Sequence, residues 1–146
     1  MASSLFETVL VPIASEGDAE ETCRAILREI YDGRPTLHVV HVIEKAGGAP
    51  DKAGVEQRKE RAERIFERVE TELADEDVIL ETEILYGTDV AEAILERAQR
   101  LDATSIVFTP RGASRWIKLL TGDVAQKLLA NTDRPLVVLP RTESHE

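Results

Sequence analysis

The sequence is poor in cysteine and contains no long apolar run. Cys23 is the one cysteine among 146 residues, which excludes an internal disulfide and is typical of proteins in a reducing compartment. The first residues lack the basic cluster and long apolar core of a secretory signal. No run approaches the ~18 apolar residues that a membrane span needs. We therefore expect a cytoplasmic protein without membrane insertion.

Basic residues are also scarce, and few of them are lysine. The chain has 28 acidic and 18 basic residues, for a net charge of −10. Binding to nucleic acid needs clustered Lys and Arg that contact phosphates, so we expect no nucleic-acid partner. A large net charge is self-repulsive and is screened by salt, so this composition favours a halophile-like protein from a salt-rich cytoplasm. The alternative is an ordinary acidic protein.

The rest of the chain alternates between strand and helix patterns. Apolar, β-branched runs predict strands at residues 5–12, 36–43, 78–85, 104–108 and 136–139. Amphipathic helices are predicted between them, and residues 45–54 are expected to be a glycine-rich connection. The first helix has its predicted cap at Ser15 or Asp18, with Glu21 completing a capping box for Asp18. The alternation predicts an α/β fold, a doubly wound open parallel sheet of five strands with four helices.

The stretch from residue 103 to residue 141 combines a glycine loop with local positive charge. It reads as strand, loop with Gly112 and Gly122, helix and strand, an arrangement in which backbone N–H groups and the helix dipole hold anions. Its net charge is +4, so the rest of the chain carries −14 and the whole chain −10. This predicts an anionic ligand or an acidic partner surface. A turn and a helix start without any ligand would use the same glycines.

Other candidate sites are weaker. His38 and His41 lie three residues apart on one predicted strand and so face opposite sides of the sheet, which argues against a shared metal ion. Cys23 falls on the apolar stripe of the first helix and is interpreted as a core residue. The sequence has no G-x-x-x-x-G-K-[ST] loop, no G-x-G-x-x-G after a strand and no G-x-S-x-G elbow. We therefore do not expect an enzyme.

Several stretches, taken in order, make the chain similar to the universal stress protein family over about residues 5–141. They are VLVP, TLHVVHVIE, YGTDVAEAILERAQ, RGASRWIKLLTGDVAQKLL and RPLVVLP. The resemblance implies a Rossmann-like, adenine nucleotide alpha hydrolase-like fold with strand order 3-2-1-4-5, in one domain over residues 1–146 with a flexible tail at 142–146. It also implies homodimers formed through the last strand, at Leu136, Val137, Val138 and Leu139. Such pairing removes the liability of an unpaired apolar edge.

Nucleotide-binding members of that family carry a Gly, two residues, a Gly, nine residues, and a Gly followed by Ser or Thr. Gly112 and Gly122 match the second and third glycines, whereas Thr109 stands at the first glycine position. Asp123 stands at the Ser/Thr position, and the family's nucleoside-contacting aspartate falls on Ala14. The nucleotide or anion site that the resemblance implies therefore consists of Ala14, Val42, Thr109, Arg111, Gly112, Gly122 and Asp123.

These departures disfavour ATP as a cofactor. Ala14 offers no acceptor, and a lost charged hydrogen bond is worth about 1.5–3 kcal/mol. Thr109 adds bulk where backbone would approach a ligand. Asp123 is expected to occupy N–H groups that a phosphate would use and to repel that phosphate, by about 4 kcal/mol at ~4 Å and an effective dielectric of ~20. Arg111 and its basic neighbours argue the other way, because they would neutralise a phosphate.

The hypothesis favoured at this point is a homodimeric regulatory or stress-response module of universal stress protein type. It would act through an unknown protein partner and would not bind ATP in the usual way. One alternative is a nucleotide-binding or small anionic ligand sensor. Another is a soluble regulatory partner of a membrane transporter, a role that domains of this family also take.

The acidic composition generates a prediction about salt. If it reflects adaptation to salt, the unfolding midpoint should rise substantially between ~0.1 and ~2 M KCl, because salt screens the repulsion among the acidic residues. Thermal unfolding followed by circular dichroism at several KCl concentrations measures this. An unchanged midpoint would contradict salt adaptation and would leave the predicted fold unaffected.

Overall fold

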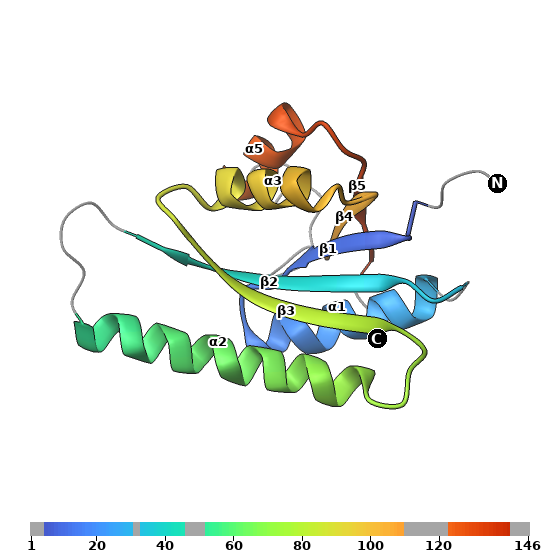
Figure 1. Cartoon of the computed structure of the whole chain (residues 1–146), viewed down its shortest axis with the longest axis horizontal. Helices are drawn as coiled ribbons and strands as arrows, with labels where there is room; N and C mark the ends of the chain where they lie inside the picture. Colours follow the sequence, from blue (N-terminus) through green and yellow to red (C-terminus); the bar gives the residue numbers. More distant parts are fainter. Residues whose placement is uncertain (1–4, 31–32, 46–51, 110–122, 141–146) are drawn as a thin grey trace.

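The computed structural model describes residues 5–30, 33–45, 52–109 and 123–140 (Figure 1). Its strands are β1 (Thr8–Pro12), β2 (Thr36–Glu44), β3 (Ile79–Gly87), β4 (Ser105–Phe108) and β5 (Leu136–Val138). Its helices are α1 (Glu16–Glu29), α2 (Lys52–Leu73), α3 (Val90–Leu101) and α5 (Asp123–Asn131). Within these ranges, no helix has both the length and the apolar character that crossing a membrane requires.

The five strands form one parallel sheet in the order β3-β2-β1-β4-β5. The central strand β1 places Val9 opposite Leu37 of β2 on one side and opposite Ser105 of β4 on the other. The doubly wound parallel fold and its strand order are therefore confirmed. Because the order reverses between β1 and β4, the chain leaves these two neighbouring strands in opposite directions, which creates a topological switch point.

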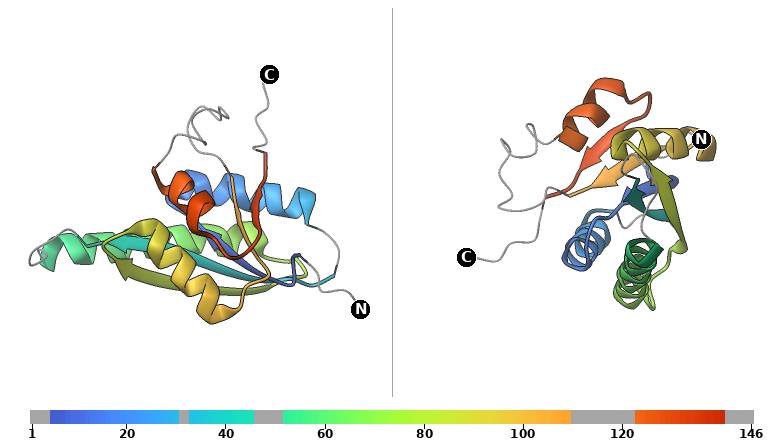
Figure 2. Two further views of the ribbon diagram at one scale, coloured as in Figure 1. Left: turned by 90° about the horizontal axis from the view of Figure 1, so that it is seen from above. Right: turned by 90° about the vertical axis from the view of Figure 1, so that its left-hand side faces the viewer.

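Helices cover both faces of this sheet, α1 and α2 on one face and α3 and α5 on the other (Figures 1 and 2). Alternate residues of β1 contribute to the two cores. Val9 and Val11 pack on the side of α1 and α2, Leu10 packs on the side of α3 and α5, and all three are fully buried. A central parallel strand must be apolar on both faces, and each such side chain contributes about 1.5–3 kcal/mol.

Several element boundaries differ from the sequence prediction; β1, for example, begins at Thr8 and not at residue 5. Two other differences make an element longer than predicted. α2 begins at Lys52, inside the predicted connection 45–54. The last two residues of β3, Tyr86 and Gly87, pair with β2, so β3 is longer than predicted. Both differences depend on neighbours. The buried stripe farther along α2 stabilises a helix that a single glycine weakens by only about 1 kcal/mol, and β2 supplies the partner backbone for the end of β3.

Cys23 lies on the buried stripe of α1 and is 1% exposed. Burial raises the pKa of its thiol to about 12, and the negative charges of Glu72 and Asp18 contribute to the rise. The thiolate is the nucleophilic form of cysteine, so this thiol is unreactive in the folded protein. The interpretation of Cys23 as a core residue is confirmed.

A buried histidine connects the edge strand β3 to the rest of the sheet. His38 of β2 places Nδ1 3.2 Å from Glu81 Oε1 and Nε2 2.9 Å from Glu83 Oε1. Arg97 of α3 donates from Nε to the same Glu83 oxygen at 2.7 Å. Partial burial raises the pKa of Glu83, but the hydrogen bonds from His38 and Arg97 outweigh this effect and hold the pKa below its ordinary value. Glu83 therefore links β3, β2 and α3.

The lowered pKa of Glu83 generates a prediction about acid stability. Its folded-state pKa lies below its unfolded-state value, so its stabilising contribution is present above the unfolded pKa and is lost as the pH falls through the folded pKa. Glu83→Gln should therefore lose less unfolding free energy than the wild type between about pH 5 and pH 3. Since the Glu83 side chain is 37% exposed, solvent screening limits the expected difference to about 1 kcal/mol or less. Urea unfolding at each pH measures it.

Glu96→Gln is the matched control, because Glu96 is an exposed glutamate of α3 that pairs with Arg100, four residues later, at 3.5 Å. This variant should follow the pH dependence of the wild type. If Glu83→Gln did so too, the role of Glu83 as a link would be wrong.

Candidate functional site

The switch point brings together the chain segments that follow β1 and β4. Ala14 and the start of α1 follow β1, and Thr109 directly follows β4. In open α/β sheets, ligands bind at the carboxyl ends of the strands where the order reverses. We call Ala14, Asp18, Thr22 and Thr109 the β1/β4 site.

Local capping positions the acid of this site. Ser15 is the N-cap of α1 and accepts a hydrogen bond from the Asp18 N–H at 3.0 Å. Asp18 is the third residue of the helix, and its Oδ2 accepts a hydrogen bond from the Ala14 N–H at 2.9 Å. Ser15, one of the two predicted caps, is thus the N-cap. The predicted capping box of Asp18 with Glu21 is replaced by a related arrangement in which Asp18 bonds the N–H of Ala14, the residue before the cap. Two N–H groups are satisfied reciprocally at this helix start.

The other oxygen of Asp18 faces two threonine hydroxyls. Thr22 donates to Asp18 Oδ1 at 3.2 Å, and Thr109 lies 3.4 Å from the same oxygen. The two hydroxyl oxygens are 2.7 Å apart, and either can be the donor. Asp18 is 8% exposed, Thr22 is fully buried and Thr109 is 3% exposed. The site is thus a buried polar network that joins α1 to the end of β4.

Burying a carboxylate is costly unless it receives hydrogen bonds. Here a main-chain N–H and hydroxyl groups meet both oxygens of Asp18, and the N-terminus of α1 adds the favourable field of the helix dipole. The hydroxyls of Thr22 and Thr109 have two protons, so they donate two hydrogen bonds among the three contacts of this network. The Asp18 carboxylate is therefore stabilised entirely by groups of its own chain.

The residues predicted for the site divide into four groups, the last of which is Asp123 alone. Ala14 and Thr109 lie together at the switch point, linked through Asp18. Val42 lies in the second half of β2, partly buried against the core beneath α3. Arg111, Gly112 and Gly122 lie outside the described residues.

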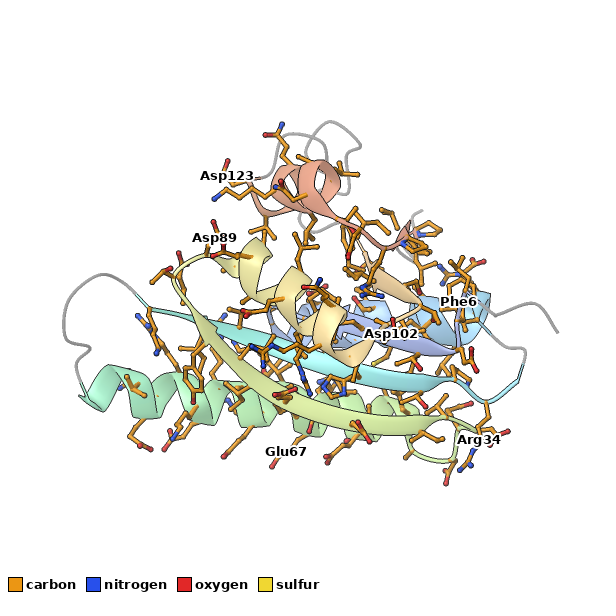
Figure 3. All side chains as sticks on the ribbon, turned by 45° about the horizontal axis from the view of Figure 1, so that its top comes forward. Phe6, Arg34, Glu67, Asp89, Asp102 and Asp123 are labelled. Carbon is orange, nitrogen blue, oxygen red and sulfur yellow. The ribbon has the colours of Figure 1, made fainter. Side chains whose placement is uncertain are left out.

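Asp123 is the first residue of α5 and is exposed (Figure 3). Near Asp123, helix α5 contacts the start of α3. Lys127 Nζ of α5 lies 2.8 Å from Oδ2 of Asp89, which is the N-cap of α3. That hydrogen bond is the main reason why the pKa of Lys127 is raised, and Asp123 contributes to the same rise. The negative charge of Asp123 therefore acts on the ammonium group of Lys127, four residues later on the same helix. The expected contact of Asp123 with helix N–H groups stays a prediction.

Sequence reasoning missed the roles of Asp18 and Thr22. The sequence pattern predicts Asp18 only as a cap and assigns no role to Thr22. One signal was available: the two residues are four apart on a helix, so they share a face, and Thr22 directly precedes the buried Cys23. The contact of both with Thr109, 87 residues beyond Thr22, had no local signal.

Among the residues that the structure describes, His, Cys, Asp and Glu side chains form no group of three that could hold a metal ion. His41 donates from Nδ1 to the Ile13 carbonyl oxygen at 2.8 Å, on the other side of the sheet from His38. The β1/β4 site therefore remains the principal candidate in this part of the chain.

The geometry first defines a class: doubly wound α/β proteins with a candidate ligand position at the switch point of the sheet. The sequence model of the Universal stress protein family matches residues 5–140. The chain belongs to the universal stress protein family, which confirms the resemblance drawn from its motifs.

One relative is the Stress response protein NhaX of Bacillus subtilis (strain 168), which is 33% identical over 81 residues. The match covers 56% of this chain and 48% of NhaX, so the chain spans about half the length of that relative.

Solved structures show the same fold. A universal stress protein family member from Burkholderia pseudomallei gives a TM-score of 0.74 at 22% identity, covering 95% of this chain and 99% of that one. The universal stress protein from Archaeoglobus fulgidus in complex with dAMP gives a TM-score of 0.64 at 18% identity, covering 93% of this chain and 99% of that one. A universal stress protein family protein from Arabidopsis thaliana with AMP bound gives a TM-score of 0.68 at 16% identity, covering 93% of this chain and 92% of that one.

Proposed function

We propose that this protein is a regulatory module of the stress response that acts through a protein partner and does not bind ATP in the usual way. Family membership and the similarity to Stress response protein NhaX support the stress-response part. The observation that carries the second part is the buried Asp18 carboxylate at the β1/β4 site, bonded to the N–H of Ala14. The partner is of unknown identity.

Two further features of the β1/β4 site oppose a nucleotide. Ala14 has no side-chain acceptor for a nucleoside, and its N–H already has a partner. Thr109 stands where nucleotide-binding members have glycine, and its side chain contacts Thr22 and Asp18.

Relatives from Archaeoglobus fulgidus and Arabidopsis thaliana bind dAMP and AMP. A nucleotide or small-anion sensor is therefore the second candidate.

We also propose that the protein is a homodimer through β5. This edge strand is short, and its residues Leu136, Val137 and Val138 are only partly buried. In the adjacent helix α5, Val124 is 39% exposed and Leu129 is 50% exposed. An apolar edge left open promotes association, and pairing with a second copy would satisfy its backbone. Leu139, by contrast, is buried in the core of its own chain, so the proposed interface relies on β5 itself.

The proposal predicts that ATP does not bind. Isothermal titration of ATP into the full chain, with and without Mg²⁺ and in buffer matched to the native salt, should show no binding up to ~1 mM. The physical reason is that the protein's own side chains already use the donors of the β1/β4 site. Mass spectrometry of small molecules released from freshly purified protein is the companion measurement. A dissociation constant in the micromolar range or a retained nucleotide would favour the sensor instead.

The proposed dimer predicts the effect of a charge on β5. Val138→Lys should weaken dimerisation at least ~10-fold, because an ammonium group is costly to bury in an apolar interface. Analytical ultracentrifugation over a range of concentrations measures the dissociation constant. Thr82→Lys is the control, since Thr82 is exposed on β3 at the opposite edge of the sheet. A monomeric wild type at ~100 µM, or equal effects of the two substitutions, would contradict a dimer through β5.

A further inference from the structure

We infer that His38 is a pH-sensitive clamp on the first half of the edge strand β3. With both ring nitrogens protonated it holds Glu81 and Glu83 at once, and with one proton lost it releases Glu81. The inference goes beyond the proposed function, because it concerns the opposite edge of the sheet from β5 and requires neither a ligand nor a dimer.

The position of His38 follows from the pairing of β2 with β3. His38 lies opposite Glu81 in the register, so their side chains leave the same face of the sheet, and Glu83 is the next residue of β3 on that face. His38 is 5% exposed, with Nδ1 3.2 Å from Glu81 Oε1 and Nε2 2.9 Å from Glu83 Oε1. The buried ring therefore bridges two carboxylates of one strand.

The two contacts fix what the ring must donate. An ionised carboxylate accepts hydrogen bonds and donates none, and a neutral imidazole has one N–H and one bare nitrogen. Only the doubly protonated ring can donate to Glu81 and Glu83 together. Histidine is the side chain whose charge ordinarily changes between about pH 5 and pH 8. The bridge is therefore complete or incomplete according to the second proton of the His38 ring.

The charged groups that face His38 come from β3 and α3. β3 contributes Glu81 and Glu83, and α3 contributes Arg97, whose Nε donates to Glu83 at 2.7 Å. On β1, the register partner of His38 is Leu10, which is apolar and fully buried. The charged ring and Arg97 together balance the two carboxylates. Loss of one proton from the ring leaves one negative charge in excess at this edge.

The two carboxylates respond differently to a neutral ring. Glu83 keeps the hydrogen bond from Arg97, and its side chain is 37% exposed. Glu81 pairs with His38, and its side chain is 59% exposed, so water can take the place of the ring. A neutral ring therefore keeps its N–H at Nε2 on Glu83, turns a bare Nδ1 toward Glu81 and leaves Glu81 to the solvent.

The first half of β3 has fewer buried side chains than the second half. Three of the four residues 79–82 are exposed, Ile79 among them, and Leu80 is partly buried. In the second half, Ile84 and Leu85 pack against the two cores. Segments with few buried apolar contacts open locally most easily. Loss of the clamp should therefore loosen residues 79–82 and leave the end of β3 paired.

The first experiment follows the imidazole nitrogens of the full chain by long-range ¹H–¹⁵N NMR between ~pH 5.5 and ~pH 8.5. For His38 we expect both nitrogens to be protonated at the acid end, and only Nε2 at the alkaline end. His41 is the internal reference, because its Nδ1 donates to the Ile13 carbonyl oxygen at 2.8 Å and should keep that proton throughout. A His38 ring that stays neutral, or stays charged, over the whole range would overturn the inference.

Glu81→Gln tests the released partner in the same NMR titration. Glutamine keeps an acceptor oxygen and removes the charge, so the midpoint of the His38 titration should fall by about half a pH unit or more, because a nearby negative charge favours the charged ring. Glu76→Gln is the matched control, since it removes an exposed acid from the connection between α2 and β3. It should leave the midpoint unchanged. Equal shifts in the two variants would reduce the effect to net charge and contradict the clamp.

The second experiment measures amide hydrogen exchange at ~pH 6 and ~pH 8, corrected for the intrinsic pH dependence of exchange. In the wild type and in Glu76→Gln, the protection of residues 79–82 should be at least ~3-fold lower at the higher pH, relative to the protection of β1. In Glu81→Gln, the protection of the same residues should already be low at ~pH 6 and should change little with pH.

The two measurements separate a titration from a clamp. A ring that changes its protonation while the protection of residues 79–82 stays constant would overturn the inference, because the proton would then have no effect on the strand. Protection that falls equally in β1 and β3 would also overturn it, because it would report a loss of global stability. Neither result would affect the proposed function.

Discussion

Burial on both faces is the constraint on which this fold depends, and β1 meets it most completely. Val9, Leu10 and Val11 are fully buried, and they point alternately into the core beneath α1 and α2 and into the core beneath α3 and α5. A strand placed there has parallel neighbours on both sides, so each parallel connection must cross a face of the sheet. The reversal of strand order beside β1 follows from this arrangement.

At that reversal the carboxyl ends of β1 and β4 lie side by side, and the chain leaves the two strands in opposite directions. Open α/β folds generally bind ligands at this point, because main-chain N–H groups and a helix start converge there. In this chain the donors at the switch point bond to a side chain of the same chain. Asp18 accepts hydrogen bonds from the Ala14 N–H and from the hydroxyls of Thr22 and Thr109. The contacts of Asp18 describe a network whose donors are already in use.

The two edge strands of the sheet, β3 and β5, differ in composition from the central strand and from each other. β3 carries Glu81, Thr82 and Glu83 along an exposed edge, and a buried histidine and Arg97 hold two of these acids in place. Charges on an edge strand oppose pairing with other chains. β5 instead presents three apolar residues. This difference in charge between the two edge strands is the physical reason why we propose dimerisation through β5 and not through β3.

The amino-acid sequence by itself determined the alternation of strands and helices, the apolar central strand, the core position of Cys23 and the family. These are properties of local periodicity and of short motifs, which neighbouring residues along the chain are sufficient to express. Element ends at Lys52 and Gly87 were missed because they depend on packing and on a partner strand. The role of Asp18 was decided only by the tertiary structure. Its partner Thr109 lies 91 residues away, and no local pattern distinguishes a capping acid in solvent from one buried beside a second strand.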